Sequence, residues 1–261
     1  MVIFFDIDGT IVDDRTQIIP DSVPRAISRL KEKGHIPVVN TGRPYSHIDP
    51  RIRTMDFSAF VCGCGMEVIL DGKPIYRNFP DLKLCRKVQQ AVRDCRMQVL
   101  YEAENGTILK DGDLSRDPTG LIECERMEKK GFSVKEIDSL PEPRFMKLVT
   151  FDGEGSRHEE FKTRMEPYFT CIERGHTMLE LVKKGCSKAG GMELLLKKLG
   201  AGRENTMAMG DSTNDLPMFS MAGHTVCMGG GMEELKAEAE FITAPVLEDG
   251  IEKALQHYHL I

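Results

Sequence analysis

Residues 2–10 read VIFFDIDGT, a continuous apolar run that leads into two acids separated by one residue. A short run of this kind is typical of a strand buried on both faces of a parallel sheet. Asp6 and Asp8 are two positions apart, so both carboxylates lie on one side of an extended chain, and Gly9 permits a tight turn after them. Close carboxylates repel unless a cation or a proton lies between them. The stretch therefore predicts either a catalytic pair, with one acid as nucleophile and the other handling a proton, or an ordinary turn with two solvated acids.

Short apolar strands alternate with helices on both sides of the middle of the chain. We expect strands at 2–7, 36–39, 60–62, 206–209 and 224–228, a hairpin of 66–70 with 74–76, and helices at 22–33, 188–199, 216–221 and 251–258. This alternation predicts an α/β fold, a Rossmann-like parallel sheet covered by helices on both faces. Ligands of such sheets bind outside the carboxyl ends of the strands, which is where Asp6 lies.

The middle of the chain is more charged and has longer segments. We expect helices at 81–95 and 157–168, strands at 97–102, 107–110 and 144–151, and a hairpin of 169–173 with 177–182. These segments predict an inserted α+β domain. The expected organisation is one domain formed by 1–80 and 185–261, with a second domain inserted at 81–184.

Composition excludes several classes of protein. The 261 residues carry a formal net charge of −6, which disfavours the basic stripe of a nucleic-acid-binding protein. The sequence contains no run of about 18 apolar residues and no basic leader at its start, so we expect neither a membrane span nor a signal peptide. Eight cysteines without zinc-finger spacing are typical of reduced thiols in a cytoplasmic protein. The oligomeric state is left open between a monomer and a small homo-oligomer.

Two further loops follow apolar strands. Thr41-Gly42-Arg43 offers a hydroxyl and backbone N–H groups that can cradle a phosphate, although an ordinary βα turn has the same composition. Residues 210–215 read GDSTND and place Asp211 and Asp215 four positions apart. Clustered carboxylates suit Mg²⁺, whereas the simpler alternative is capping of the following helix.

A lysine also occurs at an unusual place. Lys188 lies at the start of an expected helix, where the helix dipole favours acids instead of cations. The position indicates a role for its charge, although a solvent-exposed lysine is the simpler explanation.

Taken in order, these motifs resemble the haloacid dehalogenase (HAD) superfamily of phosphohydrolases. The stretch from Asp6 to Thr10 is similar to its first motif, Thr41 lies in the second, Lys188 in the third, and 210–215 in the fourth. The fourth motif, the large insertion and the tail EDGIEKAL at 248–255 resemble the Cof-type (IIB) branch. In the insertion the resemblance is limited mainly to 179–181, LEL.

The resemblance implies a Mg²⁺-dependent phosphatase acting on a small phosphate ester, with a sugar phosphate as the leading class. It also implies that 1–80 and 185–261 form the catalytic core and that 81–184 form a cap that selects the substrate. Asp6 would be the nucleophile and a metal ligand, and Asp8 the general acid/base and a ligand through its backbone carbonyl. The other implied roles are phosphate binding by Ile7, Thr41, Gly42, Lys188 and Asn214, metal binding by Asp211, and an outer shell around the metal from Ser212 and Asp215. The candidate substrate contacts are Arg43, Tyr45, Glu102, Arg174 and His176.

Three positions depart from the family pattern. Cys64-Gly65-Met66 stands where Asn-Gly-Ala is usual, 229–231 reads GGG instead of Gly-Asn-Ala, and Ala189 precedes Gly190 where a glycine usually follows the lysine. None of these changes removes a nucleophile, a metal ligand or the lysine. Two other functions stay open: a phosphomutase of the same superfamily, and a non-catalytic phosphate-binding regulatory protein on an inherited fold.

Overall fold

The structure is a computed structural model that describes residues 1–116, 118–174 and 177–261, without the side chains of Arg116 and Arg174. All statements below concern this part of the chain.

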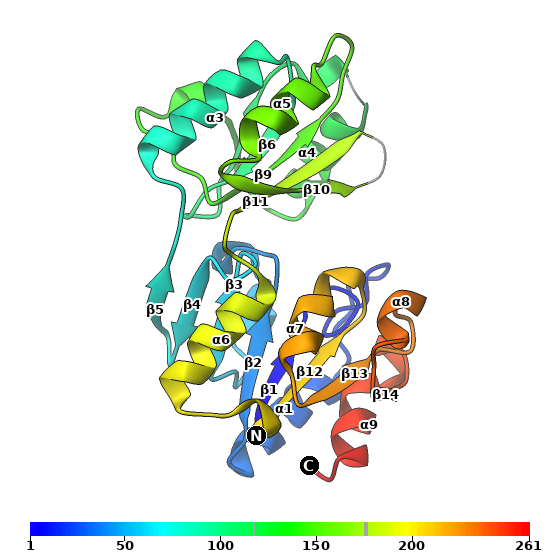
Figure 1. Cartoon of the computed structure of the whole chain (residues 1–261). Helices are drawn as coiled ribbons and strands as arrows, with labels where there is room; N and C mark the ends of the chain where they lie inside the picture. Colours follow the sequence, from blue (N-terminus) through cyan, green and yellow to red (C-terminus); the bar gives the residue numbers. More distant parts are fainter. Residues whose placement is uncertain (117, 175–176) are drawn as a thin grey trace. The chain divides into compact units, whose positions relative to one another are not determined.

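The described residues form two compact units (Figure 1). Unit 1 consists of Met1–Arg43, Ile48–Arg77 and Ser187–Ile261. Unit 2 consists of Pro44–His47 and Asn78–Cys186. Each unit has its own sheet and its own hydrophobic core.

Unit 1 is built on an eight-stranded sheet with the order β14-β13-β12-β1-β2-β3-β4-β5. Its strands are β1 (Val2–Phe5), β2 (Ile36–Asn40), β3 (Ala59–Cys62), β4 (Glu67–Leu70), β5 (Lys73–Arg77), β12 (Thr206–Gly210), β13 (His224–Cys227) and β14 (Phe241–Ile242). The strands from β14 to β3 are parallel, and β3, β4 and β5 pair antiparallel. Strand β1 lies between β12 and β2 and is fully buried, as its apolar sequence predicts.

Helices cover this sheet. They are α1 (Ser22–Glu32), α2 (Pro50–Arg53), α6 (Lys188–Leu199), α7 (Leu216–Met221), α8 (Glu233–Lys236) and α9 (Gly250–His257), with 3-10 turns η4 (Arg203–Asn205), η5 (Thr213–Asp215) and η6 (Val246–Glu248). Apolar residues of α6 and α7 pack with Phe4 and Val38 in one core cluster. Ile3 and Phe5 alternate with Phe4 along β1 and are buried on the opposite face.

Unit 2 has a six-stranded sheet with the order β10-β11-β9-β6-β7-β8. Its strands are β6 (Gln98–Glu102), β7 (Ile108–Asp111), β8 (Val134–Glu136), β9 (Lys147–Phe151), β10 (Phe169–Arg174) and β11 (Met178–Lys183). Its helices are α3 (Leu82–Asp94), α4 (Pro118–Lys129) and α5 (His158–Met165), with turns η1 (Tyr45–His47), η2 (Leu114–Arg116) and η3 (Ile137–Ser139). Only β7 and β8 pair parallel among these strands.

The two units confirm the predicted α/β core with an inserted α+β domain. The first strand is shorter than the expected 2–7, because the chain turns after Phe5. Helix α4 was not predicted: Leu121 and Ile122 are exposed, whereas Gly120 and Cys124 face the protein, so its apolar residues do not follow one face. The short elements α2, α8, β8 and β14 were also missed.

Candidate active site

The first loop of the site leaves β1 at Asp6. The Asp6 backbone N–H donates to the Met209 carbonyl (3.0 Å), which keeps this residue in register with β12 as the strand ends. The Ile7 carbonyl then accepts from three backbone N–H groups, those of residues 10, 11 and 12, so the chain closes into a compact turn. Gly9 has φ +72°, and a Cβ there would lie 2.3 Å from a carboxylate oxygen of Asp211. The glycine therefore brings the first loop directly against the loop after β12.

That second loop is shaped by one buried carboxylate. Asp215 Oδ2 accepts from the backbone N–H groups of Asp211 (3.0 Å) and Ser212 (3.2 Å), and Asp215 and Ser212 form a reciprocal capping box. The predicted helix-capping role is therefore present. Asp215 therefore caps this turn and also contacts Lys188.

Lys188 is the first residue of α6, after Ser187, whose hydroxyl accepts from the Gly190 N–H (3.0 Å). Its ammonium group is buried and donates to Asp6 Oδ1 (2.6 Å), Asp215 Oδ1 (2.5 Å) and Asn214 Oδ1 (3.3 Å). Burial alone would lower the pKa of Lys188, but the two carboxylates outweigh it and the pKa is raised. The lysine is therefore a buried cation, and the alternative of an exposed lysine was wrong.

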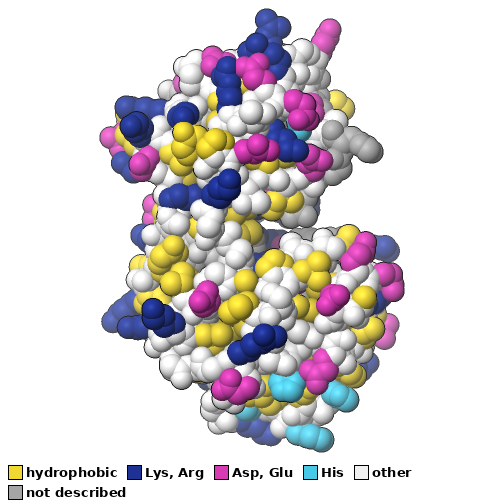
Figure 2. Space-filling view, viewed as in Figure 1, with side chains coloured by type: hydrophobic (Ala, Val, Ile, Leu, Met, Phe, Trp, Pro, Cys, Tyr) yellow, Lys and Arg dark blue, Asp and Glu magenta, His cyan; other side chains and the backbone are white. Residues whose placement is uncertain are grey.

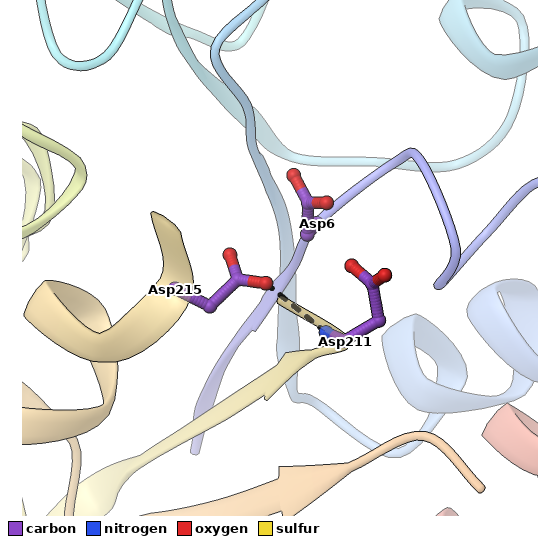
Figure 3. Close-up of side chains that lie close together, drawn as sticks. All are labelled: Asp6, Asp211 and Asp215. Carbon is purple, nitrogen blue, oxygen red and sulfur yellow. Dashed lines mark hydrogen bonds between the residues drawn. The ribbon is translucent and has the colours of Figure 1, made fainter. Parts of the chain in front are cut away.

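The carboxylates of Asp6, Asp211 and Asp215 lie close together (Figure 3). Asp6, Asp211 and Asp215 each offer an oxygen, and these oxygens lie within 4.8 Å of one another. Burial is the main cause that raises the pKa of Asp6 to about 8 and that of Asp211 to about 7, and the neighbouring charge of Asp215 adds to both. Within the described chain, the buried Oδ1 atom of Asp211 has no hydrogen-bond partner. Hard oxygen donors, surplus negative charge and an unpaired buried acceptor fit a divalent cation such as Mg²⁺.

The second predicted acid has a different environment. Asp8 stays partly exposed, and both of its carboxylate oxygens accept from Arg43, one from Nε at 2.8 Å and the other from Nη2. Arg43 follows Thr41, whose side chain is buried and whose hydroxyl accepts from the Arg43 N–H (3.2 Å). Sequence reasoning had offered Arg43 only as a substrate contact and missed its pairing with Asp8.

The turn after β3 also contacts this edge of the sheet. Gly63, Cys64 and Gly65 all have positive φ values, 58°, 54° and 82°. The Cys64 N–H donates to the Thr41 carbonyl (3.1 Å), and the Gly63 N–H donates to the Arg43 carbonyl (2.8 Å). The unusual Cys64 thus occupies a left-handed position tied to the predicted phosphate loop.

The other predicted substrate contacts belong to unit 2 or lie outside the residues that the structure describes. Glu102 ends β6, and its carboxylate lies 3.7 Å from His47 Nδ1. Arg174 ends β10, where only its backbone is described, and His176 lies outside the described residues. Tyr45 begins η1 in unit 2. Asn40 was missed altogether, although its side chain donates to the Lys188 carbonyl (3.2 Å); the available signal was a polar residue ending a buried strand.

The surface gives two further observations. Where the structure describes the chain, none of its helices combines the length and apolar character needed to cross a membrane. On the face shown in Figure 2, Lys and Arg side chains are interspersed with Asp and Glu instead of forming one basic stripe.

Sequence relatives cover nearly the whole chain. The 5-amino-6-(5-phospho-D-ribitylamino)uracil phosphatase YcsE of Bacillus subtilis is 29% identical over 262 residues, covering 99% of this chain and 96% of that protein. A second B. subtilis protein with the same activity in its name, YitU, is 26% identical over 274 residues, covering 98% of this chain and 97% of that protein.

Solved structures agree with these relatives. A HAD-superfamily phosphatase from Bacteroides thetaiotaomicron superposes with a TM-score of 0.84 at 25% identity, covering 100% of this chain and 95% of that one. A HAD subclass IIB sugar phosphatase, 24% identical, shares the fold with a TM-score of 0.79 over 100% of this chain and 99% of its own. The haloacid dehalogenase-like hydrolase model matches residues 3–255, so this chain belongs to that family of enzymes.

Proposed function

We propose that this protein is a Mg²⁺-dependent phosphatase that hydrolyses small phosphorylated metabolites through a phosphoryl intermediate on Asp6. The observation that carries the proposal is the position of Asp6, which accepts from a buried lysine and has an oxygen within 4.8 Å of oxygens of two further carboxylates. Phosphoryl transfer needs positioning and neutralisation of negative charge more than elaborate covalent chemistry. This cluster offers both.

In the first step, an Asp6 oxygen attacks phosphorus and forms a new O–P bond, while the ester O–P bond breaks. The leaving oxygen takes a proton from Asp8. The Lys188 ammonium, 2.6 Å from Asp6, offsets the repulsion between that carboxylate and the phosphate. Thr41 and the backbone of Gly42 and Ile7 would hold the phosphate oxygens at the strand ends.

In the second step, Asp8 takes a proton from water as the water oxygen attacks phosphorus. The Asp6–phosphoryl bond breaks, orthophosphate leaves, and Asp6 is regenerated as a carboxylate. Both oxygens of Asp8 accept from Arg43, so Arg43 must release one of them for Asp8 to carry the proton of the first step, and it orients the acid through the other oxygen. Asp6, Asp211 and the Asp8 carbonyl would hold Mg²⁺, which when bound would supply positive charge to the phosphate and the nucleophile.

The proposed substrate is a sugar or polyol monophosphate. Two relatives are named for a ribitylaminouracil phosphate, whose phosphate sits on a polyol chain. In this proposal unit 1 performs the chemistry and unit 2, the predicted cap, selects the leaving group.

The test is phosphate release from a panel of sugar, polyol, nucleotide and cofactor monophosphates, with and without Mg²⁺. We expect Mg²⁺-dependent turnover that Asp6→Asn abolishes. Asp21→Asn is the matched control, since Asp21 is exposed and its side chain makes no capping bond. If Asp6→Asn retained most of the activity, Asp6 would not be the nucleophile. A requirement for a bisphosphate activator would indicate a phosphomutase instead.

A further inference from the structure

The first turn of α6 packs against the turn after β3 without room for a methyl group. A Cβ on Gly191 would lie 2.3 Å from Val61 Cγ1 and 2.9 Å from the Gly65 Cα. In the other direction, a Cβ on Gly65 would lie 2.3 Å from the Ser187 carbonyl oxygen. Val61 is a fully buried β-branched residue, so it cannot swing aside. The helix start is therefore fixed by two glycines in direct contact.

A buried amide holds the same turn from β2. Asn40 is fully buried, and its Nδ2 donates to the Lys188 carbonyl (3.2 Å) and to Met218 Sδ (3.7 Å). Its Oδ1 atom is buried with no hydrogen-bond partner in the described part of the molecule. An unsatisfied buried acceptor lowers the stability of the folded state. An apolar residue of the same size would avoid that cost, so stability alone does not account for an amide here.

Both contacts act on the backbone at Lys188. Asn40 binds its carbonyl oxygen, and Gly191 sets the distance of the helix from the sheet three residues later. Among the contacts described, Lys188 Nζ is the only lysine nitrogen that donates a hydrogen bond to Asp6. A displacement of about 1 Å at a reacting centre can cost about a hundredfold in rate.

We infer that Asn40 and Gly191 are positioning residues that place the Lys188 ammonium at Asp6, an inference that rests on the proposed phosphatase function. Neither residue touches the reacting atoms. Each acts through the main chain of α6.

The main test compares two neighbouring glycines in the full-length protein with Mg²⁺. Gly191→Ala introduces the contacts described above, whereas a Cβ on Gly190 meets only Ser187 Oγ at 3.4 Å, an ordinary separation. Both replacements change intrinsic helix propensity equally. We expect Gly191→Ala to lower kcat/KM by about tenfold or more and Gly190→Ala to stay within about twofold. Equal effects of the two would overturn the inference.

Asn40→Leu provides a second variant that keeps the branching and the number of side-chain heavy atoms and removes the amide. We expect about tenfold weaker product inhibition by orthophosphate, because the lysine that faces the phosphate is displaced. The Mg²⁺ concentration for half-maximal activity should not rise, since Lys188 is not a metal ligand. A parallel loss of phosphate and Mg²⁺ affinity, or no loss of either, would reject the positioning role. If wild type and Gly190→Ala release no phosphate at all, the proposed function itself fails, and this inference with it.

Discussion

Each unit buries a lysine against carboxylates, but the balance of charge differs. In unit 1, Lys188 donates to Asp6 and Asp215, and Asp211 lies in the same cluster. In unit 2, Lys147 of β9 pairs with Glu180 of β11. These two side chains are about equally buried, with 10% and 11% of their surface exposed. The described contact in unit 2 joins one lysine to one carboxylate, whereas three carboxylates around one lysine in unit 1 leave negative charge for a cation to satisfy. The surplus of acid, not the buried lysine, marks the candidate active site.

The two clusters should differ most in their effect on activity when the lysine of each is removed. We expect Lys188→Met to lower kcat/KM by about a thousandfold, since a buried charge aimed at the reacting group is lost. Phosphate release at saturating Mg²⁺ measures this effect. Lys147→Met is the control, and we expect its activity per folded molecule to stay far closer to wild type. A similar collapse of kcat/KM in both variants would contradict the distinction drawn between the clusters.

Stability gives the second contrast. Removing one partner of a buried pair costs about 3–5 kcal/mol, so Lys147→Met should lower the free energy of unfolding by that amount, and added Mg²⁺ should restore none of it. Lys188→Met should also be destabilised without metal, but Mg²⁺ should recover much of the loss by satisfying the carboxylates. Urea unfolding with and without Mg²⁺ measures both. Recovery of Lys147→Met by Mg²⁺ would show that unit 2 also holds the metal.

Sequence reasoning predicted which side chains meet at the ends of the parallel strands. Asp6 and Asp211 each follow a short apolar strand, and parallel topology brings those ends together. The contact between Asn40 and Lys188 joins residues 148 positions apart, and it depends on how closely α6 approaches the sheet. Local patterns carry no information on that distance. The pairing of Arg43 with Asp8 was missed for the same reason, since side-chain orientation at a loop is set by tertiary packing.

The smallest expected effect is a pH dependence of metal stabilisation. The pKa of Asp6 is raised to about 8 and that of Asp211 to about 7, chiefly by burial, so the metal-free fold binds protons there that the unfolded chain has lost above about pH 4. The folded state therefore loses stability as pH rises toward 8, because it then carries unscreened buried carboxylates. Mg²⁺ must displace those protons at low pH and finds free carboxylates at high pH.

We therefore expect Mg²⁺ to raise Tm more at pH 8 than at pH 6. Below the raised pKa values, the apparent Mg²⁺ affinity should fall by about tenfold per pH unit for each proton displaced. Calorimetric melting at a fixed Mg²⁺ concentration measures the shift. Asp211→Asn removes one of the two titrating ligands, so it should weaken Mg²⁺ stabilisation and flatten its pH dependence together. An equal Mg²⁺ shift at both pH values in the wild-type protein would mean that the metal does not bind at the carboxylates that distinguish unit 1 from unit 2.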